Sequence, residues 1–173
     1  MDDLLKGLNI YLVGMMGSGK TTISKHLAKD FGYRCLDMDK MIETIASKPI
    51  SEIFRDEGEA YFRDLETKVL AELSVYTRSV ISTGGGVIQE PLNWSYLRHG
   101  LIVWLDVDIE ILQKRLVKDK SRPLVDQLES LLIARRPLYA QADLQISITK
   151  ETAPSNISAQ IVAAIPGVLK TKV

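Results

Sequence analysis

The stretch YLVGMMGSGKTT, residues 11–22, decides the class of fold. An apolar run passes here directly into three glycines, a lysine and two threonines. The stretch matches the pattern G-x-x-x-x-G-K-[S/T], in which backbone N–H groups surround phosphate oxygens and the next helix adds its N-terminal dipole. Its place between an apolar run and a helical pattern favours this interpretation over a chance glycine-rich turn. The stretch therefore predicts a binding loop for a nucleoside triphosphate, with Lys20 on the phosphates and Thr21 on Mg²⁺.

The composition excludes several classes of protein. At 173 residues the chain is long enough for one domain and too short for two of ordinary size. Basic and acidic residues number 22 each, so no overall charge attracts nucleic acid or an anionic membrane. No apolar run approaches the roughly 20 residues that a membrane helix needs. We expect one domain over residues 1–173, without nucleic-acid or membrane partners.

Cysteine usage and the first residues indicate the compartment. Cys35 is the only cysteine, which excludes an internal disulfide, and we expect it to be buried in a strand as a small apolar residue. The opening MDDLLKGLN is acidic and has no long apolar run, so it is not a secretory signal. A cytoplasmic protein is expected, or one of the plastid stroma if a leader was removed.

Short apolar runs alternate with helical patterns along the chain. Runs rich in Val, Ile and Leu predict strands at residues 9–13, 34–38, 78–83, 101–107 and 144–148. Helical spacing of apolar residues predicts helices at 20–31, 58–73, 108–117, 126–134 and 154–165. The strands lack clean alternation, which is typical of strands covered on both faces. We therefore predict an α/β fold with a parallel sheet between helices, and ligands at the carboxyl ends of the strands.

The segment LDMD, residues 36–39, ends the second predicted strand with two carboxylates. In an extended segment, Asp37 and Asp39 point to the same side. Beside a phosphate-bound metal, Asp37 would hold Mg²⁺ through water and Asp39 would accept a proton from a substrate hydroxyl. From the spacing alone, capping of the following helix is an equally good interpretation.

The segment STGGGV, residues 82–87, places three consecutive glycines after the third predicted strand. Such a run carries a large entropic cost unless something must come close to the backbone. A loop that needs residues with positive φ is the alternative interpretation. Close approach of a small polar substrate is the one we prefer.

Several arginines are candidates for binding anions. Arg63 and Glu66 are three positions apart on a predicted helix, a spacing that lets the acid orient the guanidinium towards a substrate carboxylate. Arg122 lies in KSRPLV, and Arg135 and Arg136 precede the proline of ARRPLY. These arginines are either solvated or supply positive charge around a phosphoryl group in transfer.

In their order along the chain, GMMGSGKTT, LDMD, IFRDEGEAYFRDLE, STGGG, SRPL and RRPLY resemble the motifs of the shikimate kinases. The resemblance covers nearly the whole chain, and NWSYLRHGLIVWLDV is most similar to cyanobacterial and plastid members. It implies a nucleoside-monophosphate-kinase-like three-layer sandwich with a central five-stranded parallel sheet. It also implies transfer of the ATP γ-phosphate to the 3-hydroxyl of shikimate, on the route to chorismate, with one Mg²⁺ per subunit. A monomer is expected.

The same resemblance implies roles for individual residues. The residues implied to hold ATP are Gly17, Ser18, Gly19, Lys20, Thr21, Thr22, Arg115 against adenine and Arg122 near the phosphates. Mg²⁺ would be bound by Thr21 and, through water, by Asp37. The residues implied to hold shikimate are Asp39, Arg63, Gly84, Gly85, Gly86 and Arg135, with both arginines around its carboxylate. Asp39 as base, Lys20 and Arg122 form the implied catalytic set, while Phe54 and Phe62 either wall the pocket or pack in the core.

Two departures from the family pattern concern the nucleotide side. Arg122 and Arg135 lie 13 positions apart, and the family segment is several residues longer, so we expect a shortened lid loop near residues 117–126. A basic residue often found near adenine in the last strand is Ser147 here. Both departures bear on closure and ATP affinity rather than on the chemistry.

Other functions share some of these motifs. A different small-metabolite kinase, such as a gluconate kinase, has the P-loop, but the triple glycine and the pair of Arg63 and Arg135 argue against it. A non-catalytic regulatory module would be favoured by loss of Lys20, Asp37 or Asp39, and all three are present. No N-K-x-D stretch for guanine occurs in the chain.

Overall fold

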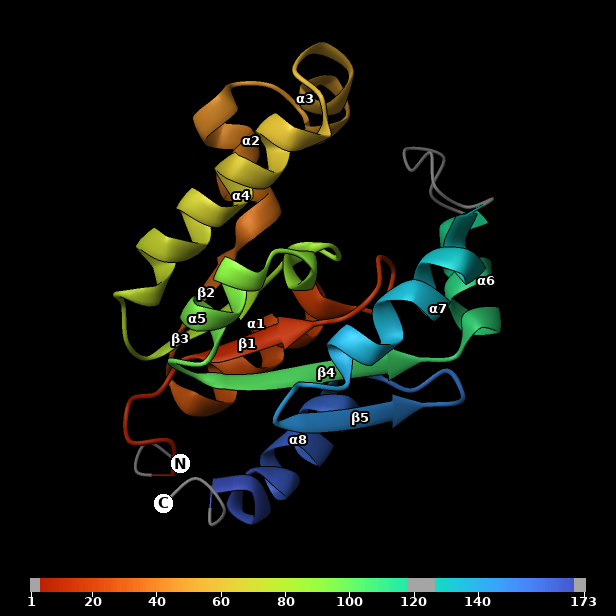
Figure 1. Cartoon of the computed structure of the whole chain (residues 1–173). Helices are drawn as coiled ribbons and strands as arrows, with labels where there is room; N and C mark the ends of the chain where they lie inside the picture. The colour runs from red at the N-terminus through yellow and green to blue at the C-terminus, as the bar shows by residue number, and fades with distance from the viewer. Residues whose placement is uncertain (1–3, 118–126, 170–173) are drawn as a thin grey trace.

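A computed structural model describes residues 4–117 and 127–169 of the chain. Its centre is a sheet of five strands in the order β2-β3-β1-β4-β5, and every paired strand runs parallel to its neighbour (Figure 1). The strands are β1 (Ile10–Val13), β2 (Arg34–Asp37), β3 (Ser79–Ser82), β4 (Leu101–Val107) and β5 (Leu144–Ile148). The five predicted strands are confirmed, with ends that differ from the prediction by one residue at most.

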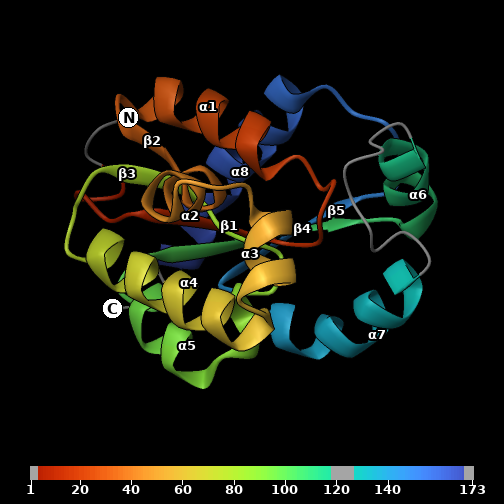
Figure 2. The ribbon, with the colours of Figure 1, turned by 90° about the horizontal axis from the view of Figure 1, so that it is seen from above.

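Helices cover both faces of the sheet, as the view from above shows (Figure 2). On one face α1 (Lys20–Phe31) packs against α8 (Pro154–Leu169). The other face carries α5 (Pro91–Leu97), with α4 (Glu59–Ser74) packed against it, and α7 (Leu128–Tyr139). The predicted three-layer α/β sandwich is therefore confirmed.

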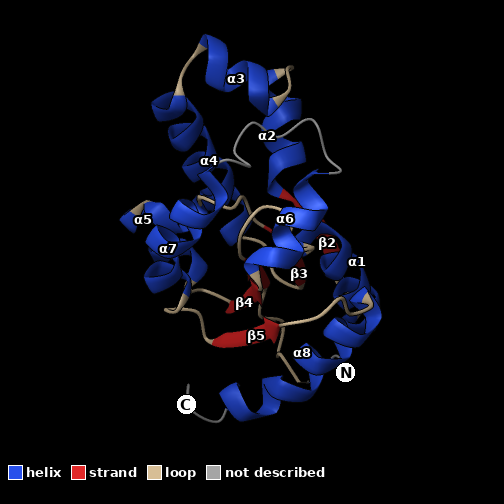
Figure 3. Ribbon diagram, turned by 90° about the vertical axis from the view of Figure 1, so that its right-hand side faces the viewer, coloured by secondary structure: helices blue, strands red, loops and turns tan. Residues whose placement is uncertain are grey.

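The remaining helices lie around the ends of the strands. α2 (Met38–Ala46) and α3 (Ile50–Asp56) follow β2 and rise above the sheet in Figure 3, while α6 (Ile109–Val117) follows β4. A short 3-10 helix, η1 (Val87–Gln89), follows the three glycines. The apolar periodicity did not predict α2, α3 or α5, which have seven to nine residues each.

Burial follows the order of the strands. Every residue of the central strands β1 and β4 is buried, as expected for strands covered on both faces. β2 is an edge strand, and its first residues, Arg34 and Cys35, are exposed. The prediction that Cys35 is buried is therefore wrong, because an edge strand has a neighbour on one side only and its start lies at the rim of the fold.

Helix α7 runs further than the sequence predicted. The predicted helix ended at residue 134, before Arg135 and Arg136, whereas α7 continues to Tyr139 and contains Pro137. Proline removes one hydrogen bond within the helix, yet Tyr139 at the end of α7 is fully buried. Tertiary packing of this last turn outweighs the local preference for an end before the proline.

The P-loop needs glycine where it leaves β1. Gly14, Gly17 and Gly19 all have φ between 78° and 147°. A Cβ atom on Gly14 would stand 2.8 Å from the carbonyl oxygen of Leu105 in β4. The loop therefore passes so close to a central strand that only a residue without a side chain fits at position 14.

We expect Gly14→Ala to destabilise the protein by steric overlap as well as by backbone strain. Gly58→Ala is the matched control, because Gly58 also has a positive φ of 86° but a Cβ atom there would meet nothing within 4 Å. Both variants lose about 1–3 kcal/mol to strain, and Gly14→Ala should lose about 1–3 kcal/mol more through overpacking. Urea unfolding measures both losses, and equal losses would show that the contact with Leu105 imposes no constraint.

Candidate active site

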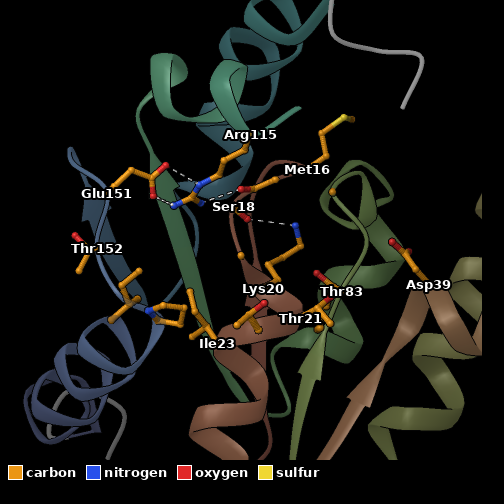
Figure 4. A pocket seen from close by; sticks show the side chains of 17 residues that line it. Met16, Ser18, Lys20, Thr21, Ile23, Asp39, Thr83, Arg115, Glu151 and Thr152 are labelled. Atoms are coloured by element: carbon orange, nitrogen blue, oxygen red, sulfur yellow. Dashed lines mark hydrogen bonds and ion pairs between the residues drawn. The ribbon is translucent and has the colours of Figure 1, made fainter. Parts of the chain in front are cut away.

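A cavity of ≈ 430 Å³ opens at the carboxyl ends of β1 and β3 (Figure 4). It brings together most of the predicted nucleotide-binding residues and two of the predicted substrate-binding residues. Its lining includes residues 16–23, Asp39, Ser82, Thr83, Gly85, Arg115, Glu151, Thr152, Pro154 and Ile157. The P-loop and the glycine loop thus border one space.

The P-loop concentrates positive charge at the start of α1. Lys20 is the first residue of this helix and is 8% exposed, with Gly19 before it in a left-handed conformation. The Lys20 ammonium donates to the carbonyl oxygens of Gly14, at 2.8 Å, and Met15, at 2.9 Å. A buried ammonium beside the N-terminus of a helix is a site suited to phosphate oxygens.

Asp37 caps α2, one of the two functions that its spacing left open, and it also contacts the P-loop threonine. Its Oδ2 atom accepts a hydrogen bond of 2.7 Å from the Thr21 hydroxyl. Its Oδ1 atom accepts one of 3.2 Å from the backbone N–H of Lys40, and through this bond Asp37 caps α2. The Ser82 hydroxyl lies 3.4 Å from that of Thr21. Because the Thr21 hydroxyl donates its hydrogen bond to Asp37, its oxygen lone pairs point elsewhere and can bind a cation.

These oxygen donors fit Mg²⁺, which prefers hard oxygen ligands and keeps several waters. Among the described residues, no group of three or more His, Cys, Asp and Glu side chains could hold a metal alone. Thr21 would bind the ion directly and Asp37 would bind it through water. Phosphate oxygens of the nucleotide would supply the remaining ligands.

Asp39 reaches the cavity from a different element than predicted. The prediction that Asp37 and Asp39 point the same way from an extended segment is wrong, because β2 ends at Asp37 and Asp39 lies in the first turn of α2. Asp39 nevertheless lines the cavity, and its Oδ1 atom lies 3.2 Å from the position that a Cβ atom on Gly84 would take. A carboxylate is thus present where the P-loop cavity meets the glycine loop.

Close approach of side chains, not backbone conformation, accounts for glycine at positions 84 and 86, whereas a Cβ atom on Gly85 would meet its nearest neighbours at an ordinary 3.5 Å. Gly84, Gly85 and Gly86 all lie outside the left-handed region. A Cβ atom on Gly84 would stand 2.5 Å from Oε2 of Glu66, and one on Gly86 would stand 2.6 Å from Cζ of Arg63. The groups that come close are charged side chains of α4, so the alternative based on positive φ is wrong.

Glu66 holds Arg63 against this loop, as their spacing predicted. Nη1 of Arg63 donates to Oε1 of Glu66 at 2.8 Å, and the Glu66 side chain is 0% exposed. Among the described residues, Oε2 of Glu66 has no hydrogen-bond partner. Burial raises the pKa of Glu66, Arg63 opposes this shift, and Asp39 adds to it.

A second arginine reaches the glycine loop from α7. Arg135 is 6% exposed, and its Nη1 atom lies 3.5 Å from the position that a Cβ atom on Gly85 would take. Burial raises the pKa of Tyr139 to about 12, so the phenol stays protonated at neutral pH and donates to the Gly85 carbonyl. Tyr139 stands in the RRPLY segment, but its hydroxyl group was missed because nothing in the sequence says that α7 ends beside the glycine loop.

Arg115 joins the P-loop to the loop between β5 and α8. Its Nη1 atom donates to the Gly17 carbonyl at 2.9 Å, and its Nε and Nη2 atoms donate to the Glu151 carboxylate at 3.2 Å and 2.8 Å (Figure 4). The sequence did not single out Glu151, which is distant in the chain from Arg115. Ser147 is exposed on β5 and does not line the cavity.

One further pair of predicted residues, Phe54 and Phe62, lies apart from this cavity. Phe62 is 4% exposed and its ring centroid is 4.6 Å from that of Phe54, whose exposed fraction is 37%. Phe62 is thus a core residue, and neither ring lines the P-loop cavity. Arg122 and most of the expected lid near 117–126 lie outside the described residues.

The fold and the site together define a P-loop kinase, in which a phosphate-binding loop borders a second polar site that carries a carboxylate and two arginines. In the part of the chain that the structure describes, no helix has the length and apolar character needed to cross a membrane.

Comparisons with known proteins identify the family. The family model "Shikimate kinase" matches residues 16–166. A shikimate kinase of Microcystis aeruginosa is 55% identical over 172 residues, which cover 96% of this chain and 90% of the relative. A shikimate kinase of Trichormus variabilis is 50% identical over 176 residues, which cover 98% of this chain and 97% of the relative. The solved shikimate kinase of Acinetobacter baumannii in complex with shikimate has a TM-score of 0.89 at 38% identity, covering 95% of this chain and 96% of its own. The chain belongs to the shikimate kinase family.

The raised pKa of Glu66 predicts a pH dependence of stability. At pH values between the ordinary pKa of a glutamate carboxyl group and the raised pKa of Glu66, the folded state binds more protons than the unfolded chain. The contribution of Glu66 to the free energy of unfolding therefore falls as pH rises through that window. Glu66→Gln keeps the shape and removes the titration.

We subtract the free energy of unfolding of the parent from that of Glu66→Gln. We expect this difference to increase from about pH 4 to about pH 8, because only the parent loses stability as Glu66 titrates. Urea denaturation at several pH values measures this difference, with Glu72→Gln as the control at an exposed position of the same helix. A difference that is constant or decreases with pH would contradict the effect of burial on Glu66.

Proposed function

We propose that this chain transfers the γ-phosphate of ATP to the 3-hydroxyl of shikimate and gives shikimate 3-phosphate, on the route to chorismate and the aromatic amino acids. The observation that carries the proposal is the glycine loop, which borders the P-loop cavity and meets Arg63 of α4 and Arg135 of α7. Two guanidinium groups near one carboxylate, Asp39, suit a small acceptor that has a carboxylate and hydroxyl groups. We further propose a cytoplasmic monomer, since all these residues belong to one chain.

On the nucleotide side, residues 17–22 would bind the phosphates through backbone N–H groups, the hydroxyls of Ser18, Thr21 and Thr22, and the Lys20 ammonium. Mg²⁺, held by Thr21 and through water by Asp37, would neutralise charge on the β- and γ-phosphates. Arg115, fixed between Gly17 and Glu151, would present its guanidinium face to adenine. By resemblance, Arg122 would add positive charge near the transferred phosphate.

On the acceptor side, Arg63 and Arg135 would bind the substrate carboxylate and Asp39 would face its hydroxyls. In the transfer, the acceptor oxygen forms a bond to the γ-phosphorus, the bond from that phosphorus to the bridging oxygen breaks, and ADP leaves. The hydroxyl proton passes to Asp39, which is why a carboxylate is required at this position. Backbone groups of Gly84, Gly85 and Gly86 would lie close to the substrate because no side chain intervenes.

A coupled assay of ADP release tests the proposed reaction. We expect release that depends on shikimate, and no stimulation by gluconate, because gluconate does not match a site built for a ring with one carboxylate. Stimulation by gluconate alone would favour a different metabolite kinase. Binding of shikimate and ATP with no ADP release would favour the non-catalytic alternative.

Asp39→Asn should lower turnover by about 10²-fold or more, because the amide keeps the size of the side chain but cannot accept the proton. Asp64→Asn is the matched control, since Asp64 is an exposed aspartate of α4 that pairs with Lys68. The same ADP-release assay measures both variants. Near-normal turnover of Asp39→Asn would remove Asp39 from the mechanism.

Lysine in place of Arg63 or Arg135 keeps the charge but loses the planar fork that binds a carboxylate with two hydrogen bonds. We expect the KM for shikimate to rise, with a loss of about 1.5–3 kcal/mol in transition-state binding. Arg55→Lys is the control, because the Arg55 side chain is 68% exposed on α3. Shikimate methyl ester should also be a poor substrate, and an unchanged KM together with normal use of the ester would overturn these assignments.

A further inference from the structure

A second ionic cluster lies at the carboxyl end of β4, outside the cavity. Asp106 of β4 is 7% exposed, and both of its oxygens accept from Nη2 of Arg136 in α7, at 2.9 Å and 3.0 Å. Nη1 of Arg136 adds a bond of 3.2 Å, and the side-chain amide of Gln145 in β5 donates to Oδ2 at 2.7 Å. The sequence left open whether Arg136 is solvated; its side chain is 48% exposed, and its guanidinium group is nevertheless bound to the sheet through Asp106.

Aromatic rings connect this cluster to the glycine loop. The Arg136 guanidinium lies over the ring of Trp104, 5.3 Å from its centroid. Trp104 in turn stacks on Tyr139, with centroids 5.8 Å apart and ring planes 20° apart. Tyr139 donates to the carbonyl of Gly85, the residue that also faces Arg135. Each step of this path is a direct contact.

The last turn of α7 needs such an attachment from outside the helix. Pro137 lies inside α7 and has no backbone N–H, so this turn loses a hydrogen bond of the helix. Among the described elements, the main packing partners of α7 are η1 and α6, neither of which is a strand of the sheet. Asp106 and Gln145, by contrast, belong to adjacent strands of the sheet.

We propose that Arg136 and Asp106 position Arg135, the residue assigned to the acceptor carboxylate in the proposed function on which this inference rests. Neighbouring residues of a helix are about 100° apart around its axis. When the Arg136 fork is attached to β4, the rotation of α7 is set and Arg135 is directed at the glycine loop. Arg136 is thus a positioning residue for substrate binding and has no contact with the nucleotide site.

Arg136→Ala should weaken shikimate binding by about 3- to 10-fold, which lies within the range of coupling between residues in contact, while the affinity for ATP changes by less than about 2-fold. Calorimetric titration of each ligand, well below the melting temperature, measures both constants. Asp106→Asn removes the same ion pair with little change of shape and should give the same selective loss. Arg136→Lys should recover only part of the affinity, because an ammonium cannot form the fork.

Arg34→Ala is the matched control for loss of a packed arginine. Arg34 also lies over an aromatic ring, 4.9 Å from the centroid of Tyr76, and donates to the Thr77 carbonyl at 2.9 Å, but it is at the amino end of β2. We expect Arg34→Ala to lower the melting temperature without changing the affinity for shikimate. A merely structural role of Arg136 would give the same result as Arg34.

The double variant Asp106→Asn/Arg136→Ala separates a pair effect from two independent ones. If the two side chains act as one anchor, the double variant binds shikimate about as well as the weaker single variant. Losses that multiply, or equal losses for ATP and shikimate, would overturn the proposal, as would unchanged binding in Arg136→Ala.

Arg135→Ala distinguishes failure of this inference from failure of the proposed function. A loss of shikimate binding in Arg135→Ala with none in Arg136→Ala would reject the anchor alone. Full binding by Arg135→Ala, or no shikimate binding by the parent, would reject the assignment of the acceptor site itself.

Discussion

The buried ion pair between Glu66 and Arg63 sets the geometry of the glycine loop, the proposed acceptor side of the site. Removing a carboxylate and a guanidinium from water costs several kcal/mol for each ion, so such a pair adds little to stability even when its geometry is good. Its presence under the glycine loop is better explained by the direction that it gives to Arg63. Glycine at positions 84 and 86 follows from the same constraint, because a side chain at either position would overlap the pair. The pair thus requires residues without side chains beside it, and it sets how closely α4 can approach the end of β3.

The strands and the P-loop could be predicted from the sequence because both depend on local patterns. A short apolar run followed by glycines at fixed spacing predicts the backbone conformation of that segment alone. The structure has the predicted strands and the predicted loop. The close spacing of Arg63 and Glu66 is also local, since one turn of α4 brings them together. The order of the motifs along the chain then indicated the family, which no single motif could do.

The remaining features depend on contacts between distant parts of the chain. Asp39 was placed on a strand because nothing in LDMD marks the residue at which β2 gives way to α2. Arg136 and Asp106 are 30 positions apart, and Arg115 and Glu151 are 36 apart, so neither pair leaves a periodic signal. Cys35 was assigned to the interior because the sequence does not reveal which strand lies at the edge of the sheet.

The two binding surfaces are built from opposite layers of the sandwich. The residues proposed to bind the nucleotide come from α1, the start of α8 and the loops next to them, whereas those proposed to bind the acceptor come mainly from α4, α7 and the glycine loop between them. Mutations that alter the acceptor layer therefore need not disturb the nucleotide layer. Selection could therefore change the proposed acceptor residues of one layer while the proposed ATP residues of the other layer stay the same, except at Asp39 of α2, which lines the P-loop cavity and also lies beside the glycine loop.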